Sequence, residues 1–175
     1  LFRSGCGADT QGMYFVPDPK APQPTTVELK FLEWNVHYEN KNTQGIADII
    51  KPNDPDVVGL DEFTANKDNL CNDLNHRLPG RRYKPQPGWS RFNGFGTYIV
   101  YDSNTFDALE GGVDKVWCHG THGGDRAANW VVLKEKTTQV YVITGGIHLS
   151  YCKGGCDSTH FCELGKMYDK FEAMK

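Results

Sequence analysis

Three short apolar runs that each end in a polar residue constrain this chain more than any other feature. The runs are Phe31-Leu-Glu-Trp-Asn35, Val57-Val-Gly-Leu-Asp-Glu62 and Val142-Ile-Thr-Gly-Gly-Ile-His148. Apolar runs of this length, rich in Val, Ile and Phe, are typical of strands that are buried on both faces. Polar residues at the ends of such strands are where an α/β sandwich places its chemistry. We therefore expect the side chains of Asn35, Glu62 and His148 to converge at one rim of a layered sheet.

The order of the predicted elements indicates the fold class. A Gly- and Pro-rich segment, residues 1–26, predicts an irregular lead-in, and residues 27–175 form one domain. Within the domain we expect strands over 27–36 and 56–60, helices over 43–51 and 66–78, neighbouring strands over 95–101 and 107–116, a hairpin of 129–134 with 139–144, and a last helix from 157 or 158. Residues 83–93 are predicted to be extended and exposed. This order favours an α/β (α+β) sandwich with a mixed sheet flanked by helices.

The helical segments predict which side chains are buried. In the first helix Ile46, Ile49 and Ile50 are expected to face inward, and in the second helix Leu70, Leu74 and Leu78 form one stripe. The apolar face predicted for the last helix consists of Phe161, Leu164, Met167, Tyr168, Phe171 and Met174.

Composition excludes several classes of protein. Apolar residues make up 38% of the 175 residues and charged residues 23%, which is typical of a globular chain. No apolar run approaches the ~18 residues of a membrane-spanning helix. The net charge of −3 does not favour binding to duplex DNA. The densest basic cluster is Arg77, Arg81, Arg82 and Lys84, which is either a solvated turn or a patch that faces phosphate.

Six cysteines favour an oxidising compartment, with secretion as the simplest case. They are Cys6, Cys71, Cys118, Cys152, Cys156 and Cys162, and an even number is consistent with three disulfides. The sequence does not choose among the pairings. An alternative is a zinc site built from Cys118, His119, His122 and the Cys152–Cys162 segment with His160.

Four motifs, in order, resemble those of the endonuclease/exonuclease/phosphatase family, which has the deoxyribonuclease-I-like fold. They are FLEWNVH, DPDVVGLDE, GFGTYIVYDSNTFDALEGG, and DRAANWVVLK followed by VYVITGGIHL. The resemblance runs from about Leu29 to Lys175. It implies that Glu62 is the main metal ligand, that Asn35 contacts the metal and phosphate, and that His148 and Arg126 are catalytic. Tyr98 and Arg126 are implied to line the substrate pocket.

The chemistry of these residues agrees with the implied activity. Mg²⁺ takes oxygen ligands, commonly one or two carboxylates plus substrate phosphate, and Glu62 offers such a carboxylate. His148 and Arg126 could stabilise the charge that develops on a phosphoryl oxygen. We therefore expect a Mg²⁺- or Mn²⁺-dependent hydrolase of phosphate esters, with Ca²⁺ and Zn²⁺ as alternative cations.

The chain also departs from the family pattern. Asp61 stands where Gln is usual, and Ser150 stands where Asp is common. The Gly-Asp-x-Asn and Asp-His motifs of the family's second half do not occur in residues 1–175. We therefore expect a C-terminal segment or a second chain to complete the sandwich, and this chain to be inactive alone. The alternatives are a non-catalytic binding or structural subunit, and a zinc-dependent hydration such as that of carbonic anhydrase.

Overall fold

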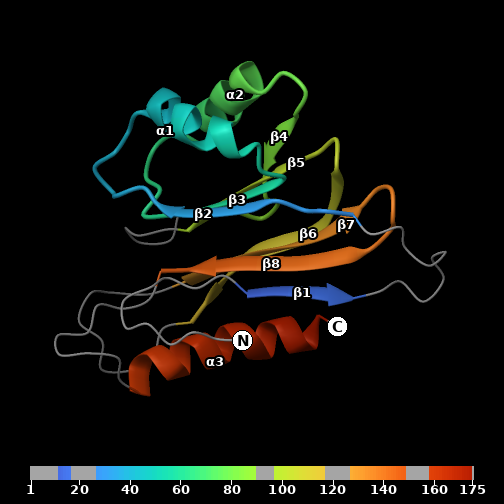
Figure 1. Ribbon diagram of the computed structural model, residues 1–175. Coiled ribbons are helices and arrows are strands. Elements are labelled where there is room, and N and C mark those ends of the chain that lie inside the picture. Colours follow the sequence, from blue (N-terminus) through green and yellow to red (C-terminus); the bar gives the residue numbers. More distant parts are fainter. Residues whose placement is uncertain (1–11, 17–26, 90–96, 117–126, 149–157, 175) are drawn as a thin grey trace.

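Two four-stranded sheets pack face to face between two helical layers. The computed structural model describes residues 12–16, 27–89, 97–116, 127–148 and 158–174. Helices α1 (Thr43–Ile50) and α2 (Lys67–Arg77) cover the outer face of one sheet, and α3 (Ser158–Ala173) covers the outer face of the other (Figure 1). The sheets meet in between, so the predicted α/β sandwich is confirmed. No described helix combines the length and hydropathy needed to cross a lipid bilayer.

The first sheet carries two of the three polar strand ends. Its strand order is β2 (Phe31–Asn35), β3 (Val57–Asp61), β5 (Tyr98–Asp102) and β4 (Tyr83–Pro85). Strands β2 and β3 are parallel, whereas β5 is antiparallel to both β3 and β4. Because β2 and β3 pair in parallel register, with Asn35 opposite Asp61, their carboxyl ends lie at the same edge of the sheet.

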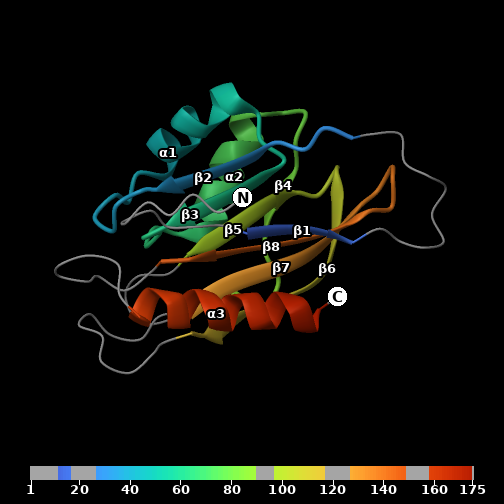
Figure 2. The same cartoon turned by 60° about the horizontal axis from the view of Figure 1, so that its bottom comes forward.

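The second sheet is entirely antiparallel. Its order is β1 (Gly12–Val16), β8 (Tyr141–Ile147), β7 (Ala127–Glu135) and β6 (Phe106–Lys115). Figure 2 shows α3 lying across the outer face of this sheet. Met167 and Phe171 of α3 are buried there against Trp130, Ile143 and Ile147.

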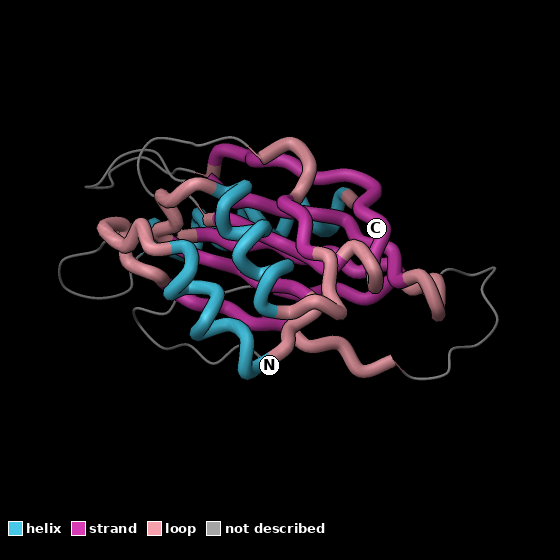
Figure 3. Tube along the Cα trace, turned by 90° about the horizontal axis from the view of Figure 1, so that it is seen from above, coloured by secondary structure: helices cyan, strands magenta, loops and turns pink. Residues whose placement is uncertain are grey.

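Asparagine caps begin both helices of the first sheet. The Asn42 side chain accepts a hydrogen bond from the Gly45 backbone at the start of α1. The Asn66 side chain accepts from the backbone of Asp68 and Asn69 at the start of α2. Such caps satisfy amides that have no partner within the helix. The two helices lie side by side over the sheet (Figure 3), and the 3-10 turn η1 (Lys51–Asn53) follows α1.

Several strand predictions need correction. The lead-in is not irregular throughout, because β1 pairs with β8 as an edge strand. Strands β5 and β6 are not partners, since the turn between them crosses from one sheet to the other. Alternating apolar residues fit both arrangements, so the sequence pattern could not distinguish them. Tyr83 is buried rather than exposed, because β4 pairs with β5.

Two predicted core residues are exposed. Ile49 of α1 is 57% exposed and Tyr168 of α3 is 48% exposed. Ile49 directly precedes the buried Ile50, and Tyr168 directly follows the buried Met167. The apolar stripe that contacts the sheet is therefore narrower than the predicted one. The side chain of Phe161 lies outside the described residues.

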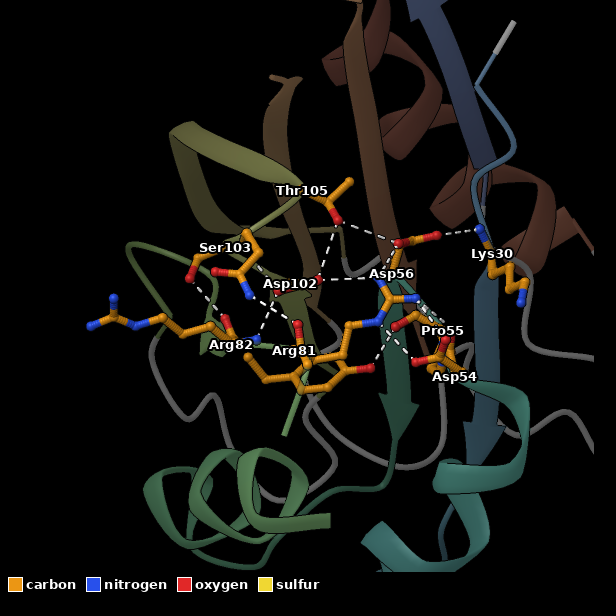
Figure 4. Close-up of polar contacts among 12 residues, drawn as sticks. Lys30, Asp54, Pro55, Asp56, Arg81, Arg82, Asp102, Ser103 and Thr105 are labelled. Carbon is orange, nitrogen blue, oxygen red and sulfur yellow. Dashed lines mark hydrogen bonds and ion pairs between the residues drawn. The ribbon is translucent and has the colours of Figure 1, made fainter. Parts of the chain in front are cut away.

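The loops at the amino end of β3 are held by one guanidinium. Arg81 donates to Asp54 at 2.8 Å, to Asp56 at 2.5 Å and to Asp102 at 3.1 Å (Figure 4). The hydrogen bonds that Arg81 donates to these carboxylates outweigh the opposing effect of burial and raise the pKa of Arg81. Arg77, by contrast, pairs on the surface with Asp48 and Asp73. Half of the predicted basic cluster is therefore neutralised by aspartates.

The cysteines do not all pair. Cys71 is a free, buried thiol on the sheet side of α2, 3.6 Å from the Tyr98 hydroxyl, so its predicted disulfide is wrong. Burial raises the pKa of this thiol to about 11. Cys162 is disulfide-bonded, and its partner lies outside the described residues. The other four cysteines (Cys6, Cys118, Cys152 and Cys156) also lie outside them, as do the loops of the zinc alternative.

Candidate active site at the rim of the sandwich

Three strand ends from two sheets meet at one rim of the sandwich. Asn35 is the last residue of β2, Glu62 directly follows β3, and His148 directly follows β8. The first two belong to one sheet and the third to the other. The residue set predicted from the three apolar runs is therefore brought together by the packing of the sheets.

Glu62 is the centre of the contacts at this rim. Its Oε1 accepts a hydrogen bond from Asn35 Nδ2 at 3.1 Å and lies 3.2 Å from His148 Nε2. Its Oε2 accepts from the backbone amide of Tyr38 at 3.0 Å. The side chains of Glu62 and His148 are each 16% exposed, so the carboxylate is mostly covered yet still reaches solvent.

These contacts favour the ionised form of Glu62. Burial alone would raise the pKa of this carboxyl, but the hydrogen bonds from Asn35 and Tyr38 and the nearby imidazoles of His148 and His37 outweigh it. The net result is a pKa below the ordinary value. A carboxylate that stays ionised and partly open to solvent is suited to hold a cation.

The segment after β2 contributes groups that the sequence prediction missed. A strand that continued beyond Asn35, as expected for residues 27–36, would point His37 away from Asn35. The strand instead ends at Asn35, and His37 takes a left-handed conformation with φ of 65°. Its backbone amide donates to Asn35 Oδ1 at 3.0 Å, and the next amide, of Tyr38, reaches Glu62. The local sequence signal for this turn is weak: Asn35 accepts from the amide two residues on, as in an Asx turn, but the left-handed position is occupied by His37 instead of Gly.

Glu62 itself is in a left-handed conformation, with φ of 55°. Non-glycine residues in this region cost free energy, and such strain clusters at functional sites. Here the strain is offset by three polar partners of the side chain. The turn directs the carboxylate toward Asn35 and His148, rather than along the direction that a continuing strand would impose.

A buried polar bridge joins the sheets beneath this rim. Thr97 Oγ1 donates to the Gly146 carbonyl at 3.0 Å, and Asn129 Nδ2 donates to Thr97 Oγ1 at 2.6 Å and to the Thr97 carbonyl. Thr97 precedes β5 of the first sheet, whereas Gly146 belongs to β8 of the second. Because Gly146 is two residues before His148, the bridge fixes the end of β8 relative to the sheet that carries Glu62.

The donor set fits a hard divalent cation better than zinc. Mg²⁺ binds proteins through one or two carboxylates and keeps other positions for water and phosphate oxygens, and Glu62 offers one such carboxylate. Asn35 Oδ1 accepts from His37 and retains a second lone pair. Within the described ranges, no three His, Cys, Asp or Glu side chains gather as a metal cluster. The ligand set that zinc requires is therefore not found in that part of the chain.

Tyr98, another predicted site residue, is not part of this cluster. Tyr98 is fully buried, its hydroxyl donates to the Lys67 carbonyl at 3.2 Å, and its ring stacks on Phe63. Its predicted role in lining the substrate pocket is wrong, because this face of β5 packs against α2. Arg126 lies outside the described residues, so its predicted catalytic and substrate-binding roles stay predictions.

Comparison with known proteins agrees with this architecture. The family model described as "Endonuclease/Exonuclease/phosphatase family" matches residues 32–148. The chain belongs to this family. The match includes Asn35 and Glu62 and ends at His148, and the predicted resemblance is therefore confirmed.

Two solved structures of this family share the fold. A family protein from Bacteroides thetaiotaomicron matches with a TM-score of 0.58 and 17% identity, over 83% of this chain and 59% of that one. A second, from Bacteroides vulgatus, has the same TM-score and identity, over 83% of this chain and 60% of that one. The chain thus spans about three fifths of the length of these structures. A search of curated proteins returned no match.

Proposed function

We propose that this chain carries part of the active site of a metal-dependent phosphoric-ester hydrolase. The observation that supports the proposal is the contact of Glu62 with Asn35 and His148, two polar strand ends from different sheets. A structural surface carboxylate would not need three polar partners from two separate segments, together with a strained backbone. Membership of the family adds support, since its name covers enzymes that cleave phosphate esters.

Each residue has a distinct part in the proposed chemistry. Glu62 would hold a Mg²⁺ or Mn²⁺ ion, which would supply positive charge to a phosphate group of the substrate. Asn35 orients the Glu62 carboxylate through its amide nitrogen. His148, whose Nε2 faces the same carboxylate, would donate a hydrogen bond to a phosphoryl oxygen as negative charge develops there. Arg126 would neutralise the same charge.

We propose that another segment completes the site. Water must be oriented for attack on phosphorus, and Asn35, Glu62 and His148 offer no separate base for this step. Strand β2 pairs only with β3 among the described strands, so its outer edge can accept a further strand. A C-terminal segment or a second chain adding there would stand directly beside Asn35.

The proposed compartment is extracytosolic, and the proposed substrates are not duplex DNA. The disulfide of Cys162 supports an oxidising environment, because such bonds are rare in the cytosol. A net charge of −3 does not support the basic surface that neutralises duplex phosphates. Smaller phosphate esters suit this charge better.

The proposal is tested on the full-length natural protein. We expect Mg²⁺- or Mn²⁺-dependent hydrolysis of at least one of bis-p-nitrophenyl phosphate, DNA and phosphoinositides, with Ca²⁺ assayed in parallel. Glu62→Gln should reduce the rate by a factor of about 10² or more, whereas Glu110→Gln, an exposed carboxylate on β6, should leave it unchanged. If no metal supports turnover of any substrate, the proposal fails and a non-catalytic subunit on the same fold is favoured.

A further inference from the structure

We propose that a polar hollow at the opposite end of the sandwich is a second binding site, specific for small anions that carry phosphate or pyrophosphate. The hollow has a volume of about 370 Å³ and is lined by Arg82, Lys84, Tyr101, Ser103, Asp107 and Lys136, among others. This inference does not depend on the proposed hydrolase activity.

The hollow lies where the edges of the two sheets face each other. Lys84 of β4 pairs with Tyr101 of β5, so both side chains lie on the same face of the first sheet. Tyr101 packs on that face against Phe106 of the second sheet. Asp107 comes from β6, and Lys136 from the turn between β7 and β8. Residues from both sheets therefore form one concave surface.

Two cations of the hollow have no ion-pair partner among the described residues. These are the guanidinium of Arg82 and the ammonium of Lys84, and both side chains are exposed. Lys136 lies 3.4 Å from Asp107 and also donates to the Ser103 carbonyl. Three positive charges and one negative charge thus line the hollow, which leaves an excess of positive charge for an anion.

Asp102, next to Tyr101 in β5, does not neutralise this charge, because its side chain lies on the other face of the sheet. Asp102 pairs with Tyr83, whose ring is buried beneath the helices, and alternation places their side chains opposite to those of Tyr101 and Lys84. Asp102 is engaged by Arg81 there. In Figure 4 the side chain of Arg82 extends away from the Arg81 guanidinium.

The backbone that presents Arg82 is held on both sides. Its amide donates to Asp102 Oδ1 at 2.8 Å, and its carbonyl accepts from the Ser103 amide and the Ser103 hydroxyl. Lys84 follows within the paired strand β4. The cations are therefore carried by a rigid segment, so an anion that binds them orders only their side chains.

This hollow is separate from the rim that holds Glu62. Tyr101 pairs with Val57 at the start of β3, whereas Glu62 follows the end of that strand. At a rise of about 3.3 Å per residue, the two places are roughly 16 Å apart along the sheet. A ligand bound in the hollow therefore cannot touch Glu62 or His148 unless it is much longer than a pyrophosphate.

Phosphate and pyrophosphate are the anions that this arrangement fits. Guanidinium and ammonium groups from two sides bind phosphate oxygens through charge-assisted hydrogen bonds. The volume is in the lower range of small-molecule sites, which run from roughly 300 to 1,000 Å³. The predominantly polar lining does not suit an apolar ligand. A compact, multiply charged anion is therefore expected.

The experiment titrates pyrophosphate into the ¹⁵N-labelled protein at constant ionic strength, with a chelator present so that no metal complex forms. We expect saturable shifts of the amide signals of Ser103, Asn104 and Lys136. Lys84→Gln and Arg82→Gln should each weaken binding by a factor of about 5 or more, because each removes one charge that contacts the anion. Lys51→Gln, which removes an exposed cation near α1, should leave it unchanged.

Three results would overturn the proposal. One is the absence of saturable shifts at about 10 mM pyrophosphate, a concentration that reveals even weak specific binding. Another is equal weakening by Lys51→Gln, which would indicate diffuse attraction. The last is a set of shifts centred on Asn35 and Glu62 instead of the hollow. The side chains of Lys51, Arg82 and Lys84 are all exposed, so the three variants are expected to fold. The same spectra report whether they do.

Discussion

His148 Nε2 lies 3.2 Å from Glu62 Oε1, although the two residues belong to different sheets. Glu62 follows a strand that is covered by α1 and α2, and His148 follows a strand that is covered by α3. Their contact therefore exists only when the two sheets are packed together. The candidate site is a product of the interface between the layers, and any change that loosens this interface should also disturb the site.

The contact predicts an effect on the ionisation of Glu62. His148→Asn removes an imidazole that, when protonated, helps to hold the pKa of Glu62 below its ordinary value. We expect this pKa to rise, as followed by carboxyl-carbon NMR during an acid titration. His76→Asn removes an exposed imidazole of α2 and should leave it unchanged. An unaltered pKa in His148→Asn would show that the two side chains do not interact in solution.

The lowered pKa of Glu62 also predicts a pH-dependent contribution to stability. A carboxyl whose pKa is lower in the folded state stabilises the fold at pH values above its unfolded-state pKa. This contribution disappears as the pH falls through the folded-state value. Glu62→Gln should therefore lower the free energy of unfolding more at pH 7 than at pH 3, as measured by urea denaturation. An equal difference at both pH values would contradict the lowered pKa.

The aspartate cluster around Arg81 predicts a contrast between adjacent arginines. Arg81→Gln leaves Asp56 and Asp102 buried without their cation, so we expect a loss of about 3–5 kcal/mol in the free energy of unfolding. Arg82→Gln changes an exposed side chain and should alter it by less than about 0.5 kcal/mol. Chemical denaturation of both variants makes the comparison. Similar values for the two would mean that the cluster does not form.

The polar bridge beneath the rim predicts a cost for losing one hydroxyl. Thr97→Val keeps the shape but removes the hydroxyl that donates to the Gly146 carbonyl and accepts from the Asn129 amide, which keeps only its bond to the Thr97 carbonyl. We therefore expect a loss of about 1–3 kcal/mol in the free energy of unfolding. Thr137→Val, at an exposed turn, should change it much less. Equilibrium denaturation measures both. A stability close to that of the wild type would show that the bridge is not formed.

The corrected face of α3 predicts which of its aromatic residues matters. Phe171 is buried between the helix and the second sheet, and Phe171→Ala should cost about 3–5 kcal/mol of unfolding free energy. Tyr168 is mostly outside this contact, so Tyr168→Ala should cost far less. Thermal and urea unfolding distinguish the two. A larger effect of Tyr168→Ala than of Phe171→Ala would show that Tyr168 belongs to the buried face of α3, as the sequence predicted.

Some of the site could be predicted from the sequence because it depends on local patterns. Short apolar runs ending in Asn35, Glu62 and His148 indicate strands with polar ends, and all three strands are found. Strands β3 and β8 are buried as expected, whereas the expected burial of β2 is wrong, because β2 is half-exposed beside its single described partner β3. The helix positions follow from apolar spacing. The sandwich and the hairpin of β7 and β8 follow from the order of these elements, and the family follows from the resemblance of four motifs. All three are confirmed.

Other features depend on which surfaces meet, and only the tertiary structure decides them. Alternation cannot tell that the turn after Asp102 crosses between sheets, that Tyr98 faces α2, or that β2 ends early enough for His37 to turn back. Spacing in the sequence indicates which side chains share a face, whereas packing determines what that face contacts. Packing also determines which charges are neutralised. Arg81 forms ion pairs with three aspartates, whereas the adjacent Arg82 lines the hollow.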